Sequence, residues 1–167
     1  QVFILMVLCL IIIIRADYYF LWNCAVQTAD ECKKICEYNP TVKYFGIITN
    51  EEMLIKQREA TFLVNPRPVD DEYTKYSFPS KNIEYMTSGR PIITTKLPCI
   101  TEDYNPFVYY FEDDSIEGIK NTIKMCCELH DNELLEKGNK ARKYILNNKN
   151  NKIQIKRVLE LVKELKS

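Results

Sequence analysis

The sequence is poor in glycine and histidine. Its 167 residues include four glycines, and none of them falls in the G-x-G-x-x-G or G-x-x-x-x-G-K-[ST] patterns of dinucleotide-binding folds and P-loops. The one histidine, His130, is remote in sequence from Cys32 and Cys36. These absences exclude both glycine-rich phosphate loops. They also disfavour a zinc site, which needs pairs of cysteine or histidine at short spacings.

An excess of charge of either sign is also lacking. Lys plus Arg and Asp plus Glu number 23 each, so the formal net charge is zero. A basic surplus would favour nucleic acid as a partner, and acidic blocks would favour a disordered tail. With 46% apolar residues, the chain is instead expected to fold around one core and to bind no nucleic acid.

The cysteines form no disulfide or metal pattern. They number seven, an odd count, and their spacings suit no zinc motif; Cys32 and Cys36 lie four apart on a predicted helix. The full set is Cys9, Cys24, Cys32, Cys36, Cys99, Cys126 and Cys127. We therefore expect buried or inactive thiols of a cytoplasmic protein, with no metal and no cofactor.

Residues 2–14 form an unbroken apolar run, VFILMVLCLIIII. The run is shorter than the roughly 20 residues that a transmembrane helix needs. A secretion signal is the alternative, but no basic residue precedes the run, and Arg15 follows it in place of small residues. We predict a buried apolar helix over residues 1–15 and assign it no role. Because the chain begins with Gln rather than Met, we also expect its true start to lie upstream.

Farther along, short runs of β-branched and aromatic residues alternate with helical patterns. Strands are predicted at 18–22, 42–45, 61–64, 91–95 and 108–111, and helices at 28–38, 49–60, 80–88 and in three stretches after residue 114. The three later helices are expected to carry these apolar faces, in chain order: Ile116, Ile119, Ile123 and Cys127; Leu134, Gly138, Ala141 and Ile145; and Ile155, Val158, Leu159, Val162 and Leu165. Thr28 and Thr49 each begin a capping box. This alternation predicts an α/β fold with a Rossmann-like parallel sheet and flanking helices. Ligands bind such sheets at the carboxyl ends of the strands, so the loops after Phe45, Val64 and Thr95 are the candidate functional loops.

The most informative stretch is the loop that leads into the helix predicted at 80–88. Ser80 and Lys81 stand at the helix start, where unpaired N–H groups and the helix dipole favour an anion such as phosphate. Glu84 follows one helical turn later, and its carboxylate can accept hydrogen bonds from ribose hydroxyls beside that phosphate. An ordinary helix start with a solvated Lys81–Glu84 face is the alternative. Gly89 and Pro91 are predicted to end the helix.

The segment 78–98, FPSKNIEYMTSGRPIITTKLP, resembles the donor-binding segment of GT-B glycosyltransferases. The resemblance is to the retaining enzymes with an E-x7-E motif that build capsular and lipopolysaccharide glycans, whose members are similar to F-P-S-K-x-x-E-Y-M-A-S-G-x-P-V-I-T-T. Segments 43–52, 58–67, 111–115 and 140–144 match in the same order. The resemblance runs from Asp17 to the C-terminus. It implies that residues 1–167 are a partial C-terminal, nucleotide-sugar-binding domain that lacks its opening strand and the N-terminal acceptor-binding domain.

The resemblance also implies a set of nucleotide-sugar-binding residues. Glu84 would bind the ribose, and Ser80 and Lys81 would lie near the diphosphate. The full set is Phe78, Ser80, Lys81 and Glu84 in the donor segment, Ile47 and Ile48 beside the base, and Asn65 and Arg67 near the donor sugar. It contains no catalytic residue and no metal ligand. We expect Glu84→Ala to remove nucleotide binding with little loss of stability.

The implied function is transfer of a sugar from a nucleotide sugar to a glycan hydroxyl, with the acceptor bound through the missing domain. The chain alone is expected to be inactive, and any membrane contact is expected to be peripheral, at the inner face. The sequence departs from the family at Tyr76, where a first Glu often stands, and at Cys99, where glycine is usual. A non-catalytic or decayed α/β nucleotide-binding module is the alternative.

Overall fold

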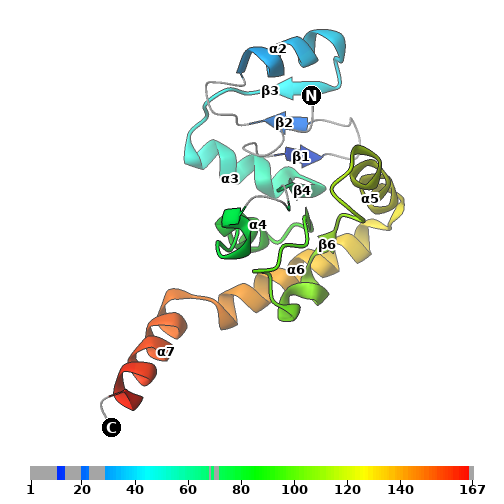
Figure 1. Ribbon diagram of the computed structural model, residues 1–167. Helices are drawn as coiled ribbons and strands as arrows, with labels where there is room; N and C mark the ends of the chain where they lie inside the picture. The colour runs from blue at the N-terminus through cyan, green and yellow to red at the C-terminus, as the bar shows by residue number, and fades with distance from the viewer. Residues whose placement is uncertain (1–10, 14–19, 23–28, 68, 70–71, 166–167) are drawn as a thin grey trace.

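The computed structural model describes residues 11–13, 20–22, 29–67, 69 and 72–165 (Figure 1). In chain order, the elements are β1 (Ile11–Ile13), β2 (Phe20–Trp22), α2 (Ala29–Tyr38), β3 (Val42–Tyr44), α3 (Asn50–Glu59), β4 (Phe62–Asn65), the 3-10 helix η3 (Glu72–Lys75), α4 (Ser80–Ser88), β5 (Ile92–Thr94), the 3-10 helix η4 (Glu102–Phe107), β6 (Tyr109–Tyr110), α5 (Ile116–Glu128), α6 (Asp131–Asn148) and α7 (Asn151–Glu164). The predicted alternation of strands and helices is confirmed for these residues.

The central sheet has the order β1-β4-β5-β6. Strands β4, β5 and β6 run parallel, with Leu63 opposite Ile92 and Ile93 opposite Tyr109. Strand β1 pairs antiparallel with β4, and β2 and β3 form a separate parallel pair. The fold is therefore mixed α/β with a three-stranded parallel core and flanking helices, as the sequence predicts in outline.

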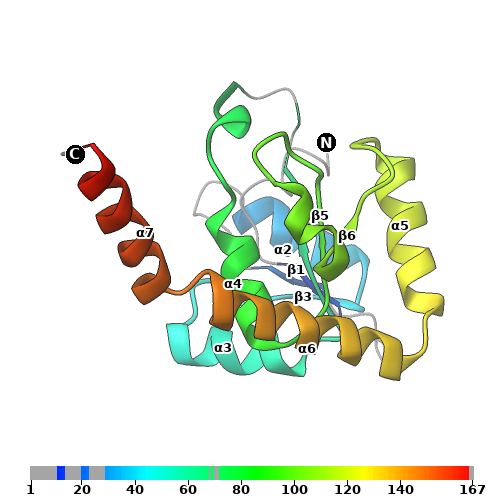
Figure 2. The ribbon, with the colours of Figure 1, turned by 90° about the horizontal axis from the view of Figure 1, so that it is seen from below.

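Helices cover both faces of this sheet, so its strands carry apolar residues on both sides. Leu63 and Ile92 face a cluster that includes Tyr85 and Met86 of α4 and Ala141 of α6. The alternate residues Phe62, Val64 and Ile93 face a second cluster, with Ile119 and Cys126 of α5 and Leu134 of α6. Figure 2 shows α4 and α5 on opposite sides of β5 and β6.

The ends of α3 and α4 follow the predicted capping rules. The hydroxyl of Thr49 accepts from the Glu52 N–H, and the Glu52 carboxylate accepts from the Thr49 N–H at 2.8 Å, which completes the capping box. Gly89 ends α4 in the left-handed conformation, with φ 81°. The start of α4 differs, because Pro79 precedes it and no side chain caps its N–H groups.

The prediction of an apolar helix over residues 1–15 is wrong at residues 11–13, which form β1. A short apolar run does not distinguish a strand from a buried helix, and the β-branched isoleucines favour the edge of β4. This strand lies beside β4 and runs antiparallel to it. Residues 1–10, 14–19 and 23–28, which include the Thr28 capping box, lie outside the described residues.

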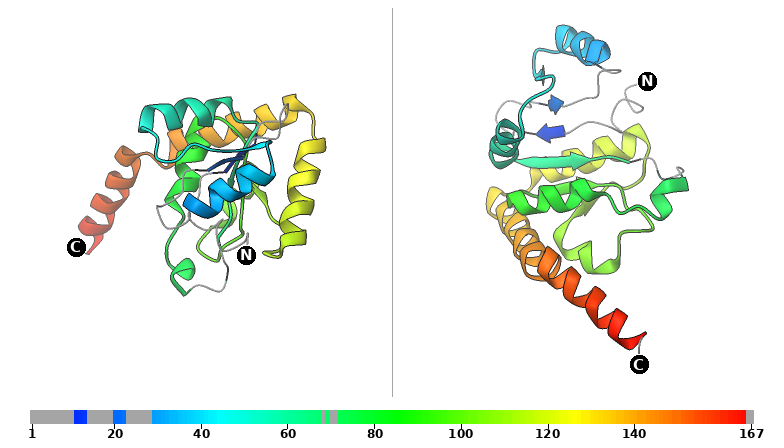
Figure 3. Two further views of the ribbon diagram at one scale, coloured as in Figure 1. Left: turned by 90° about the horizontal axis from the view of Figure 1, so that it is seen from above. Right: turned by 90° about the vertical axis from the view of Figure 1, so that its left-hand side faces the viewer.

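Two predicted apolar helix faces differ from the structure. Ile116 is exposed because α5 begins at this residue, and the buried face of α5 carries Ile119, Thr122 and Cys126. Helix α7 is present where predicted, but none of its described residues is buried. Figure 3 shows α7 projecting away from the remaining helices. Within the described ranges, no helix has both the length and the apolar character that a membrane crossing requires.

Candidate functional site

The candidate site lies where β4 and β5 end and α4 begins. Three buried polar side chains join these elements. Nδ2 of Asn65, the last residue of β4, donates to Oδ1 of Asn82 at 2.6 Å. Nδ2 of Asn82 donates in turn to Oγ1 of Thr94 at 3.2 Å, and this hydroxyl donates to the Asn65 carbonyl oxygen at 3.0 Å. This closed network fixes the first turn of α4 against the ends of both strands.

A small cavity of about 90 Å³ lies at the start of α4. Its walls include the side chains of Arg67, Ser77, Phe78 and Ser80. The backbone N–H of Arg67 donates to Oγ1 of Thr95 at 2.9 Å, which anchors the arginine beside the end of β5. Nε of Arg67 is buried and has no hydrogen-bond partner among the described residues. Together with the uncapped N–H groups of α4, this guanidinium makes the cavity suited to an anion.

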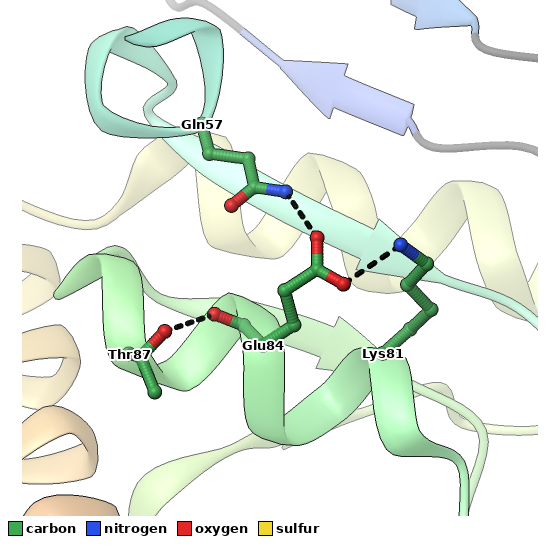
Figure 4. A network of polar contacts seen from close by, with 4 residues as sticks. All are labelled: Gln57, Lys81, Glu84 and Thr87. Atoms are coloured by element: carbon green, nitrogen blue, oxygen red, sulfur yellow. Dashed lines mark hydrogen bonds and ion pairs between the residues drawn. The ribbon is translucent and has the colours of Figure 1, made fainter. Parts of the chain in front are cut away.

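One turn farther along α4, the Glu84 carboxylate is held from two sides, as Figure 4 shows. Nε2 of Gln57 in α3 donates to Oε1 of Glu84 at 2.8 Å. Nζ of Lys81 donates to Oε2 of Glu84 at 2.7 Å. The Glu84 side chain remains 32% exposed, so its carboxylate is both oriented and accessible to a ligand. Each carboxylate oxygen can accept more than one hydrogen bond, which leaves room for further donors.

Gln57 is the part of the site that sequence reasoning missed. Its side chain is fully buried, and its Oε1 has no hydrogen-bond partner among the described residues. The residue lies on α3, a helix with little amphipathic character, so no apolar stripe marked position 57 as buried. Only the spatial proximity of α3 to α4 identifies Gln57 as a neighbour of Glu84.

The structure brings together some of the predicted residues and separates others. Arg67, Phe78 and Ser80 line the same cavity. Lys81 forms an ion pair with Glu84 on α4, the helix that begins at this cavity. Asn65, expected near a donor sugar, is buried, and its amide is directed to Asn82. Ile47 is exposed and Ile48 is half-buried in the loop between β3 and α3, and neither lines the cavity.

Two neighbours add detail to the surroundings of the cavity. Burial raises the pKa of Tyr85; the Glu84 charge adds to this effect, and the Arg67 charge opposes it. Cys99 stands where the resembled family usually has glycine, and its thiol donates to the Ser77 carbonyl oxygen at 3.4 Å. This contact joins the loop after β5 to the loop before α4.

A larger and more open hollow of about 540 Å³ adjoins the small cavity, because Leu97 lines both. Polar side chains of Lys96, Glu102 and Asn105 contribute to its walls. It lies after the carboxyl end of β5, the position at which parallel sheets bind ligands. The two hollows are therefore neighbours at the carboxyl ends of the strands.

Metal-ligating side chains do not gather here: within the described residues, no group of three or more His, Cys, Asp or Glu is placed to hold an ion. The chain matches no model of a known protein family, and a search of curated proteins finds no significant match.

Proposed function

We propose that the chain binds a nucleoside diphosphate sugar at the start of α4, as the donor-binding half of a GT-B-type glycosyltransferase. The proposal depends on Nε of Arg67, which is buried and has no hydrogen-bond partner among the described residues. It lies at the cavity beside the start of α4, whose N–H groups no side chain caps. A buried guanidinium donor needs a hydrogen-bonding partner, and a phosphate oxygen supplies one with complementary charge.

The position of Glu84 supports a nucleotide rather than free phosphate. Glu84 is four positions after Ser80, which corresponds to a rise of about 6 Å along the helix. This distance suits a ligand whose phosphate lies at the helix start and whose ribose lies one turn farther. A carboxylate accepts hydrogen bonds from two vicinal hydroxyl groups, which a ribose presents and a phosphate does not.

The F-P-S-K-x-x-E segment supports the more specific assignment. Phe78, Ser80, Lys81 and Glu84 stand in this segment in the order of the resembled family. The larger hollow beside Leu97 offers room for the sugar attached to the diphosphate. Ile47 and Ile48 retain their proposed contact with the base only if the β3–α3 loop closes over the ligand.

In the proposed reaction, the bond between the sugar's anomeric carbon and the diphosphate oxygen breaks, and the diphosphate leaves with the bonding electrons. The acceptor hydroxyl forms the new bond to the anomeric carbon, and its proton passes to the departing diphosphate. Arg67, Lys81 and the start of α4 would stabilise the charge that develops on the leaving group. A second domain would bind the acceptor, so we expect no transfer by this chain alone.

Calorimetric titration with UDP and GDP at low salt tests the proposal. Arg67→Met is compared with Arg142→Met, because both variants remove one positive charge and Arg142 lies exposed on α6. We expect Arg67→Met to weaken binding by about tenfold and Arg142→Met to leave it nearly unchanged, given the strength of charge-assisted hydrogen bonds. Inorganic pyrophosphate should compete with the nucleotide. Equal losses in both variants, or no competition, would contradict the proposal.

A further inference from the structure

The pairing of Gln57 with Glu84 has a role beyond packing. Gln57 is 0% exposed and comes from α3, whereas Glu84 comes from α4, so their hydrogen bond of 2.8 Å fixes a carboxylate on one helix from another. We propose that Gln57 is a positioning residue that orients the Glu84 carboxylate toward the two ribose hydroxyls of the nucleotide. The inference rests on the proposed function.

The chemistry of the contact fixes the orientation of the Gln57 amide. The carboxylate of Glu84 only accepts hydrogen bonds, so the NH2 group of Gln57 must face it. Lys81 holds the second oxygen at 2.7 Å, and Figure 4 shows the two donors reaching different oxygens. Both oxygens are thereby fixed in space, and each keeps acceptor capacity for one hydroxyl of a vicinal diol.

The oxygen end of the Gln57 amide indicates that a glutamine at this position does more than stabilise the fold. Oε1 of Gln57 is buried without a hydrogen-bond partner among the described residues. An unsatisfied buried acceptor destabilises a fold, and an apolar side chain of similar volume would avoid that loss. The oxygen end of the amide therefore destabilises the fold, while the NH2 end orients Glu84. Residues at binding sites often lower stability in this way in favour of function.

An uncharged donor also suits the role. A second cation at position 57 would neutralise Glu84 further and would compete with the weakly acidic hydroxyl donors of a ribose. The glutamine amide orients the carboxylate and leaves its charge available. Lys81, by contrast, is 42% exposed and can shift toward the diphosphate when a ligand binds.

The test compares Gln57→Met with the wild-type chain, using UDP, GDP and their 2′,3′-dideoxy forms as probes in calorimetric titrations. Methionine keeps the volume of the side chain and removes the amide donor. We expect the wild type to bind the ribose form about tenfold more tightly than the dideoxy form, and Gln57→Met to lose most of this preference. The affinity of Gln57→Met for the dideoxy form should differ little from that of the wild type, because this probe has no ribose hydroxyl groups that Glu84 could bind.

A matched control separates positioning from general destabilisation. Thr122→Val removes a buried hydroxyl on α5, where Oγ1 of Thr122 donates to the Gly118 carbonyl oxygen at 2.9 Å, on the other side of the sheet. This variant should lose stability and keep the full ribose preference. If Gln57→Met keeps the preference as well, the positioning role is wrong although the binding site stands. If the wild type binds neither probe, or binds both equally, the proposed function fails and this inference fails with it.

Should Gln57→Met not fold, Gln57→Leu decides with the same two probes. Leucine also fills the buried position without an amide donor, so the ribose preference should again fall severalfold. An unchanged ratio of the two affinities would overturn the role of Gln57.

Discussion

Asn65 and Asn82 are joined by a buried hydrogen bond of 2.6 Å, from Nδ2 of the first to Oδ1 of the second. The bond connects the last residue of β4 to the first turn of α4. Thr94 of β5 completes the network. The start of α4, where we propose that the diphosphate binds, is therefore held by the sheet itself, and the Asn65 amide is part of the network that holds it.

Asn82→Leu tests this support. The leucine has the same branched shape but leaves the Asn65 amide buried without its acceptor, so we expect a loss of about 2–3 kcal/mol in the free energy of unfolding. Urea denaturation measures it. Asn148→Leu makes the same exchange at an exposed position near the end of α6 and should change stability by less than about 0.5 kcal/mol. Equal losses in both variants would show that the network contributes nothing.

Gly138 of α6 packs directly on the end of α4. A Cβ atom at this position would lie 2.2 Å from the Gly89 carbonyl oxygen, which is backbone and cannot turn away. We expect Gly138→Ala to destabilise the fold by about 2 kcal/mol by forcing the two helices apart. Gly118→Ala meets mainly the end of the Asp113 side chain and should lose less. Thermal denaturation of the two variants compares them, and a smaller loss at position 138 would contradict the packing.

Asp103 predicts a pH dependence of stability. Hydrogen bonds from the Thr101 and Tyr144 hydroxyls, and the ammonium of Lys149 at 3.0 Å, lower the pKa of the Asp103 carboxyl. A depressed folded-state pKa stabilises the fold above the unfolded pKa of about 3.9, and the effect fades as pH falls through the folded value.

Asp103→Asn should therefore destabilise the chain near pH 7, by less than about 1 kcal/mol because the carboxylate is largely exposed to solvent. The difference from the wild type should shrink below about pH 4. Urea denaturation at a series of pH values measures it. A difference that grows as the pH falls would have the wrong sign for this account.

Cys126 tests the core on the α5 side of the sheet. Burial raises the pKa of this thiol to about 12, with Cys127 adding to the effect and Lys137 opposing it. At pH 8 it should therefore react with iodoacetamide only when the fold opens, while the half-buried Cys36 reacts in the folded chain. Peptide mapping by mass spectrometry distinguishes the sites. Comparable rates at Cys126 and Cys36 in native buffer would contradict the burial.

The sequence predicted the helical part of the fold well, because local chemistry dominates there. The capping box at Thr49 and the left-handed Gly89 are confirmed, as is the buried stripe Leu134, Gly138, Ala141 and Ile145. Each depends on neighbours within one or two turns. The strand at Ile11–Ile13 was missed because its partner, β4, lies far along the chain. The exposed apolar face of α7 differs from prediction because periodicity does not show what packs against a helix.

The candidate site was predicted only in part, for a related reason. Motif order identified Arg67, Ser80 and Glu84, which the structure places around one helix start and its next turn. The same reasoning assigned a sugar contact to Asn65, whose amide is buried, and it passed over Gln57. Both outcomes depend on contacts between elements distant in sequence, which neither spacing nor composition specifies.

Calorimetric titration of the wild type and of Glu84→Gln with UDP and GDP shows whether Glu84 binds the ribose of a nucleotide. Glu84→Ala would also leave the buried Gln57 amide unpaired, so glutamine is the cleaner substitution. We expect the wild type to bind one of the two nucleotides. Glu84→Gln should bind it at least about tenfold more weakly, with the free energy of unfolding changed by less than about 1 kcal/mol. Equal affinity in the two chains, or no binding by the wild type, would contradict it.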